Sequence, residues 1–193
     1  MSSKYTRRGV SEYEKMAEYI YELAAGKQGN YMVFFPSYRM LEDIYEIFRN
    51  KTEERQFEVS CILQSSNMTE QEREEFLEAF QENSAKTLIG FCVMGGIFSE
   101  GIDLTGERLI GAAIVGTGLP QVGCEREILK NYYDEKAQNG FAYAYRYPGM
   151  NKVLQAAGRV IRTKEDRGVV LLLDERFSAK RIFRIIPTGM AEL

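Results

Sequence analysis

YMVFF at residues 31–35 is the first of five short apolar runs that decide the fold of this chain. The others are VSCIL at 59–63, LIGFCV at 88–93, LIGAAIV at 109–115 and VVLLL at 169–173. Most of these runs are continuous rather than alternating. That pattern is typical of strands that are buried on both faces of a parallel sheet.

Helical patterns lie between these runs. Apolar residues step by three and four from Val10 to Ala24, and again over residues 41–48. Thr69 and Glu72 have the spacing of a capping box at the start of a further helix. Strands that alternate with helices predict an α/β fold in three layers, with helices on both faces of a doubly wound, mainly parallel sheet.

One stretch departs from this alternation. Between Gly116 and Pro148 the chain is polar, compatible with helices and rich in Tyr and Phe. It predicts a small helical excursion at about residues 119–148 within a single domain of residues 1–193. Its rings are expected to pack against the core, and a surface on which bases stack is the alternative.

Composition excludes several classes of protein. With three cysteines, no C-x-x-C spacing and no histidine, we expect no disulfide framework, zinc site or self-contained iron–sulfur cluster in this chain. The lack of histidine also excludes Ser-His-Asp and Cys-His hydrolases. No apolar run approaches the roughly 20 residues that span a bilayer, and the N-terminus lacks an apolar signal core. We therefore expect a soluble, cytoplasmic protein with no membrane partner.

Charge is unevenly distributed along the chain. The net charge is −3 at pH 7, yet residues 151–193 hold nine Lys and Arg against five Asp and Glu. Because an acidic chain does not bind polyanions through bulk charge, any contact with phosphate or nucleic acid must be local. The basic C-terminal quarter is where we expect it.

The strongest local pattern is MNKVLQAAGRVIR at residues 150–162. On a helix with ~100° per residue, Gln155, Arg159 and Arg162 share one face near Lys152, and apolar residues lie opposite. Guanidinium groups suit terminal phosphate oxygens, which is the chemistry of an arginine finger. From spacing alone, a solvated or ion-paired face is the commoner alternative.

Two glycine-rich strings are weaker signals. GTGLPQ at 116–121 lacks the third glycine of a dinucleotide fingerprint, so a Rossmann-type oxidoreductase fits poorly. GGIFSEGID at 95–103 follows an apolar run and carries two carboxylates, but alone it is equally compatible with a plain turn. The chain contains no G-x-x-x-x-G-K-[ST] loop to hold nucleotide phosphates.

Three ordered segments together resemble the DinG/XPD-type DNA helicases of superfamily 2. Residues 155–177 (QAAGRVIRTKEDRGVVLLLDERF) are similar to motif VI and the strand after it. Residues 96–106 (GIFSEGIDLTG) are similar to motif V, and residues 31–38 (YMVFFPSY) to motif IV. The similarity extends from about Lys4 to Ile186.

The resemblance implies a RecA-like fold and the second motor domain, or C-terminal half, of an ATP-dependent DNA helicase. In this family ATP and Mg²⁺ bind between two RecA-like domains, mainly to the first, which in many members also holds an iron–sulfur cluster. The implied partners are single-stranded DNA and the N-terminal RecA-like domain of the same protein, and in a bacterium the implied location is the nucleoid. We therefore expect this chain to be inactive by itself.

The resemblance also implies three groups of site residues. The catalytic group contacts the ATP phosphates and consists of Arg159, Arg162 and Gln155; either arginine is eligible as the finger. The nucleotide-binding group consists of Glu100, Gly101 and Asp103. The DNA-binding group touches the strand's backbone without reading its sequence, and consists of Ser37, Tyr38 and Ser99.

The alternative function is a retained fold that binds a partner protein or nucleic acid without nucleotide chemistry. The absence of a phosphate-binding loop from these residues favours it. A G-x-G-K-T string and a D-E-A-H-like string encoded upstream would exclude it.

Overall fold

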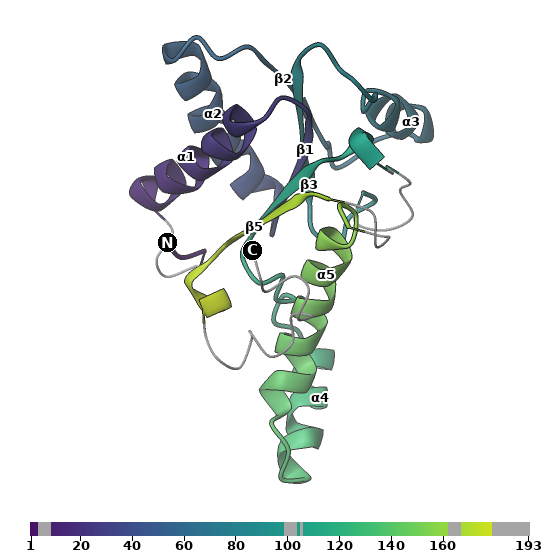
Figure 1. The fold of residues 1–193 in the computed structure, drawn as a ribbon. Coiled ribbons are helices and arrows are strands. Elements are labelled where there is room, and N and C mark those ends of the chain that lie inside the picture. Colours follow the sequence, from purple (N-terminus) through teal and green to yellow (C-terminus); the bar gives the residue numbers. More distant parts are fainter. Residues whose placement is uncertain (4–8, 99–103, 105, 162–166, 179–193) are drawn as a thin grey trace.

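Five parallel strands form one sheet in the order β2-β3-β1-β4-β5 (Figure 1). The computed structural model describes residues 1–3, 9–98, 104, 106–161 and 167–178. The strands are β1 (Asn30–Phe35), β2 (Val59–Leu63), β3 (Thr87–Val93), β4 (Gly111–Val115) and β5 (Val169–Leu173), and every pairing is parallel. Each of the five apolar runs therefore coincides with a strand to within two residues, and the prediction of a parallel sheet is confirmed.

Burial separates the central strands from the edge strands. Every residue of β1 and β4 is buried, and so are all but the last of β3. The edge strands β2 and β5 are mostly half-buried, since each has a neighbour on one side only. Continuous apolar sequence thus corresponds to strands buried on both faces at the centre of the sheet. At the edges of the sheet, equally apolar strands are only partly buried.

Two apolar clusters lie on opposite faces of the sheet. One packs the helices α1 (Val10–Gly26) and α2 (Tyr38–Glu54), and the other packs α3 (Glu70–Glu78) and α5 (Tyr147–Ala157). Side chains of β1 alternate between them, with Val33 in the first cluster and Phe34 in the second, because successive strand residues point to opposite faces. The result is the predicted three-layer fold (Figure 1).

The capping box that the sequence predicts is present at the start of α3. The backbone N–H of Glu72 donates to Thr69 Oγ1 at 3.3 Å, and the backbone N–H of Thr69 donates to the Glu72 carboxylate at 2.7 Å. Two donors that the first turn leaves without helical partners are thereby satisfied.

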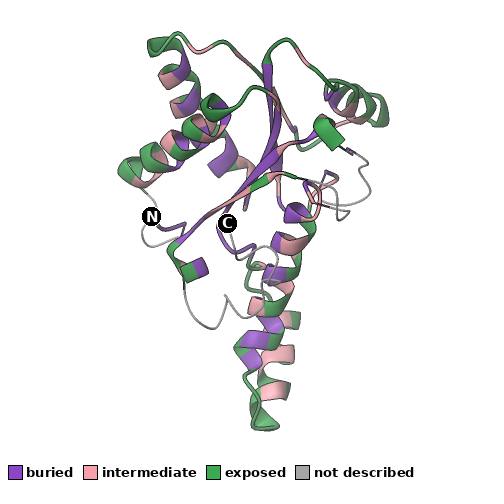
Figure 2. Ribbon diagram, viewed as in Figure 1, coloured by how far each residue is buried: buried purple, intermediate pink, exposed green. Residues whose placement is uncertain are grey.

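A helical hairpin projects from the sheet (Figure 1). It consists of α4 (Cys124–Glu135) and a π-helical turn, η3 (Ala142–Arg146), that continues into α5; α4 has no buried residue (Figure 2). Among its rings Tyr145 is buried, whereas Tyr143 is 38% exposed and stacks on Tyr133 with ring centroids 4.1 Å apart. The hairpin's rings thus pack largely on one another rather than against the core.

Candidate functional site

The carboxyl ends of the strands meet at one edge of the sheet, where residues 37 and 38 of the predicted DNA-binding group lie. Ser37 is the N-cap of α2, and its hydroxyl accepts from the Met40 N–H at 3.4 Å. Tyr38 begins the helix, and its hydroxyl accepts from Gln64 Nε2 at 3.0 Å and donates to the Ser65 carbonyl at 3.3 Å. Both side chains are half-buried at the junction of β1 and α2.

Gln64 organises this edge, and the sequence analysis missed it. Its side chain is 4% exposed, and its Oε1 accepts from the Val93 N–H at 2.9 Å while its Nε2 donates to Tyr38. It therefore joins the ends of β1, β2 and β3. Its only signal in the sequence is its position directly after an apolar run.

The predicted continuous helix over residues 150–162 is wrong beyond Ala157. α5 ends there, with Gly158 as its C-cap. The N–H groups of Arg159 and Val160 bond to carbonyls three residues back, at 3.2 and 3.1 Å. Glycine is a poor helix former and such bonds tighten the last turn, so a 100° wheel no longer describes the direction of Arg159.

The predicted amphipathic character of this segment is nevertheless present. Val153, Ala157 and Val160 are buried, at 5% exposure or less, and Gln155 is exposed. Arg159 is half-buried. The polar side of residues 153–160 therefore lies at the surface, and the apolar side packs against the core.

The segment of α5 and the residues just after it runs from the carboxyl edge of the sheet to its amino edge. It begins at the carboxyl edge, where Gly149 packs on the backbone of Thr117, and after it Val160 packs beside Gly168 at the amino end of β5. Arg159, next to Val160, therefore lies toward the amino end of β5 and away from Ser37 and Tyr38 at the carboxyl edge, and Gln155 lies on α5 between the two ends.

The other five predicted site residues lie outside the described residues: Ser99, Glu100, Gly101, Asp103 and Arg162. Phe98, immediately before four of them, is fully buried and stacks on Phe76 with centroids 4.1 Å apart. The described part of the glycine-rich string thus ends with a side chain in the core.

A second polar cluster that the sequence analysis did not single out for function is centred on Asp174, at the carboxyl end of β5. Its carboxylate accepts from Ser3 Oγ at 2.6 Å, Ser3 N at 2.9 Å and Arg176 Nε at 2.6 Å. Burial alone would raise the pKa of Asp174, but the hydrogen bonds from Arg176 and Ser3 outweigh it and lower the pKa to about 2. The cluster ties residues 1–3 to β5.

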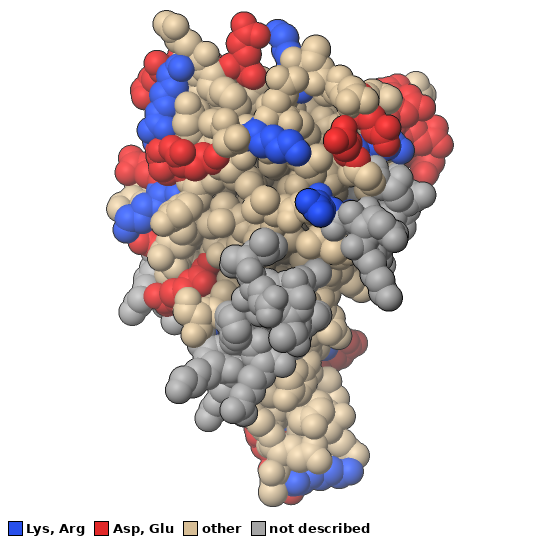
Figure 3. Space-filling model, viewed as in Figure 1, with Lys and Arg blue, Asp and Glu red and all other residues tan. Residues whose placement is uncertain are grey.

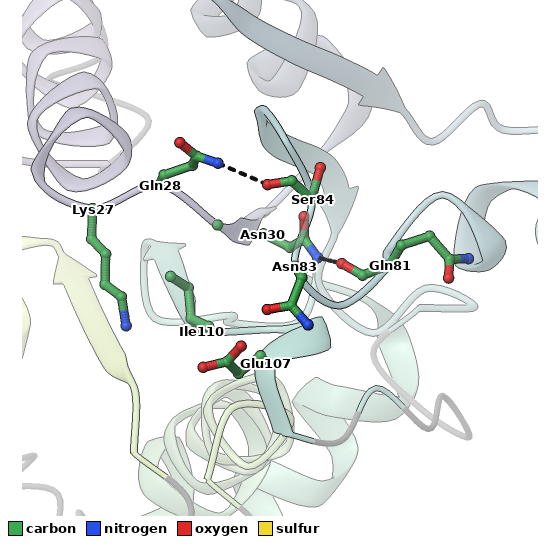
Figure 4. Close-up of a pocket in the computed structure, with 9 residues that line it drawn as sticks. Lys27, Gln28, Asn30, Gln81, Asn83, Ser84, Glu107 and Ile110 are labelled. Atoms are coloured by element: carbon green, nitrogen blue, oxygen red, sulfur yellow. Dashed lines mark hydrogen bonds between the residues drawn. The ribbon is translucent and has the colours of Figure 1, made fainter.

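A cavity of about 270 Å³ lies at the opposite, amino edge (Figure 4). No predicted site residue lines it. Asn30 Nδ2 donates to the Gln81 carbonyl at 2.7 Å, and Gln28 Nε2 donates to the Ser84 carbonyl at 2.8 Å. These amides connect the loop before β1 to the loop before β3, which is a structural role.

In the described part of the chain, no three His, Cys, Asp or Glu side chains gather as a set of metal ligands. None of the helices described is both long enough and apolar enough to cross a bilayer.

A parallel sheet in this strand order, with polar groups along its carboxyl edge and helices on both faces, defines a RecA-like domain. Over residues 20–192 the sequence matches the family described as "Helicase C-terminal domain", and the chain belongs to that family. It is 30% identical to Regulator of telomere elongation helicase 1 of Bos taurus, over 92% of this chain and 16% of the relative. It is also 30% identical to the "General transcription and DNA repair factor IIH helicase subunit XPD/RAD3" of Saccharomyces cerevisiae, over 78% of this chain and 20% of the relative.

Solved structures agree on the fold. Apo XPD superposes with a TM-score of 0.75 at 22% identity, covering 95% of this chain and 36% of that one. A structure of the XPD helicase gives a TM-score of 0.74 at 21% identity, covering 95% and 32%. The chain thus spans about a fifth of the length of these two curated relatives and about a third of each solved chain.

Proposed function

We propose that this chain is the second RecA-like motor domain of an ATP-dependent DNA helicase, which supplies an arginine finger and part of the track for single-stranded DNA. In this proposal residues 1–193 form one domain, and about residues 119–148 are its helical insertion. The chain is inactive without the N-terminal RecA-like domain of the same protein. Family membership over residues 20–192 supports the proposal.

The observation that carries the proposal is the polar side of residues 155–159 over a buried apolar back. Arg159 or Arg162 donates to the phosphate oxygens of ATP held by the other domain, and Gln155 hydrogen-bonds a phosphate oxygen or orients the attacking water. ATP supplies the phosphoryl group that is transferred to water. A guanidinium suits this role because it keeps its charge and presents several donors in one plane.

The remaining groups follow from motifs V and IV. Glu100, Gly101 and Asp103 lie beside the nucleotide, and Ser37, Tyr38 and Ser99 contact the strand's backbone. The position of Ser37 and Tyr38 at the carboxyl edge, apart from Arg159, supports separate strand and nucleotide surfaces. Hydroxyl and backbone contacts to phosphate fix the strand's register without reading its bases.

The cofactors and location belong to the same proposal. The other domain binds most of the ATP and its Mg²⁺, and holds the iron–sulfur cluster if the protein has one. We propose that the protein acts on DNA inside the cell, at the nucleoid in a bacterium.

The test is steady-state ATP hydrolysis by the full-length protein that carries this chain. We expect Arg159→Ala or Arg162→Ala to lower kcat by ~10³-fold or more, which is the magnitude of an arginine finger. Arg49→Ala is the matched control, because Arg49 lies on α2 and pairs with Glu46 at 2.8 Å on the surface. Wild-type turnover in both variants would refute the assignment, and so would robust hydrolysis by residues 1–193 alone.

A further inference from the structure

Lys152 is a cation at the carboxyl edge to which the proposed function gives no role. It lies on α5, one turn before Gln155, and is half-buried. Within the described residues its ammonium has no ion-pair or hydrogen-bond partner. A lysine held in place without a counter-charge is suited to an anionic ligand.

Two glycines from different loops define the path of the Lys152 side chain. A Cβ on Gly118, after β4, would lie 3.4 Å from Lys152 Cβ. A Cβ on Gly95, after β3, would lie 3.0 Å from Lys152 Cε and 3.1 Å from Nζ. Because β1 lies between β3 and β4 in the sheet, the side chain extends from one loop to the other past the carboxyl end of β1.

This position is a topological switch point. β1 continues into α2 on one face of the sheet, whereas β4 leads to α5 on the other. Met94 N–H donates to the Phe35 carbonyl at 2.8 Å and holds the ends of β3 and β1 together. Open α/β sheets bind their ligands in the crevice beyond the carboxyl ends of the strands at such a point.

The turn after β3 has no side chains at residues 95 and 96, because both are glycines. Gly95 has a φ of +70°, and any side chain there would occupy the space of the Lys152 stem. A Cβ on Gly96 would lie 2.9 Å from Gln64 Nε2. The turn is therefore flanked by an ammonium on one side and an amide donor on the other, next to the N-terminus of α2, whose dipole also favours an anion.

We propose that Lys152 contacts a backbone phosphate of the single strand. This rests on the proposed function, because Lys152 lies against Gly95, and the adjoining Gly96 lies against Gln64, whose amide donates to Tyr38 of the DNA-binding group. The proposed ATP contact at Arg159 lies about 10 Å further along the segment at ~1.5 Å per residue. Acidic and basic side chains are interspersed on the face of the molecule that Figure 3 shows, so one local cation matters more than bulk charge.

The test is binding of oligothymidylate to the full-length protein, followed by fluorescence anisotropy over a series of salt concentrations. Each phosphate contact to a single strand contributes about 0.7 to the slope of log affinity against log salt. We expect Lys152→Ala to lower the slope by about 0.7 and the affinity about fivefold at about 0.1 M salt. Lys152→Arg should keep the wild-type slope, because the charge remains.

Lys130→Ala is the matched control, because Lys130 lies on α4 and pairs with Asp134 at 3.5 Å. It should keep the wild-type slope. A wild-type slope in Lys152→Ala overturns the proposal for Lys152 and leaves the proposed function intact. A wild-type slope together with a raised KM for ATP overturns it by assigning the lysine to a nucleotide phosphate. If the wild-type protein binds no strand, the proposed strand track fails and this proposal fails with it.

Discussion

Asp174 and Glu18 have the same lowered pKa in very different surroundings, and replacing each with its amide should give very different results. The pKa of Asp174 is about 2, set by Arg176 and Ser3 against a burial that opposes them. The pKa of Glu18 is also about 2, set by hydrogen bonds from Arg55 and Lys51. The Asp174 side chain is 0% exposed and that of Glu18 is 35% exposed.

The magnitude for Asp174 follows from linkage. Its ordinary pKa is 3.8, and a shift to about 2 at about 1.4 kcal/mol per unit corresponds to about 2 kcal/mol of stability at neutral pH. Asp174→Asn also places an amide N–H₂ against the donors of Ser3 and Arg176, so we expect a loss of about 2 kcal/mol or more. Glu18→Gln should lose well under about 1 kcal/mol, because solvent screens an exposed pair.

The sign of the pH dependence is fixed by the direction of the shift. Because the pKa of Asp174 is lower in the folded state, its stabilisation is complete well above 3.8 and is lost as the pH falls toward about 2. The difference between wild type and Asp174→Asn should therefore be constant from neutral pH to about pH 5 and roughly halve near pH 3.

The assay is equilibrium urea unfolding followed by far-UV circular dichroism, which suits a chain that has no tryptophan. The free energy of unfolding is compared for wild type, Asp174→Asn and Glu18→Gln at each pH. Equal losses in the two variants would refute the reasoning, as would a loss in Asp174→Asn that did not shrink below pH 4.

Two further predictions use matched sites within the chain. Gly116 has a φ of +79°, and a Cβ there would lie 2.5 Å from Ser3 Oγ, so Gly116→Ala should destabilise the protein by about 2 kcal/mol. Gly26→Ala, where nothing lies within 4 Å, should be neutral or stabilising. Equal free energies of unfolding in urea for the two variants would contradict the close packing of Ser3 against Gly116. Burial raises the pKa of the Cys61 thiol to about 12 and also raises that of buried Cys92, whereas Cys124 is exposed. Iodoacetamide at mild alkaline pH should therefore alkylate Cys124 fast, and the other two thiols only at the rate of unfolding. Rapid alkylation of all three cysteines, followed by mass spectrometry, would contradict this.

The sequence predicted the features whose causes are local. Continuous apolar runs located all five strands of the described residues, because burial on two faces leaves no room for polar residues in the central ones. The capping box at Thr69 was predictable because both partners lie within one turn of helix. The end of α5 was not, because a periodicity of 3.6 residues assumes the geometry that Gly158 interrupts.

The features that were missed depend on contacts between distant residues. Gln64 meets Val93 across 29 residues, where β2 and β3 end side by side, and Ser3 meets Asp174 across 171 residues, where the N-terminal residues lie against the end of β5. Lys152 was visible as a neighbour of Gln155, but its path across β1 depends on two loops that a helical wheel does not contain. Site chemistry at the carboxyl edge of a sheet is assembled by topology, which residue spacing along one segment does not encode.

The position of α5 has a consequence for how the two proposed surfaces communicate. Lys152 lies in the middle of α5 and Arg159 lies just beyond its C-cap, Gly158, and between them Val153, Ala156 and Ala157 are each 2% exposed or less. A helix so packed has little freedom to slide or rotate, because close-packed side chains resist small displacements. We therefore expect a change at the nucleotide to move the strand contacts by displacing this whole domain against its partner domain. Rearrangement of residues 147–157 within the domain is not required, and the two surfaces should keep their spacing throughout the cycle.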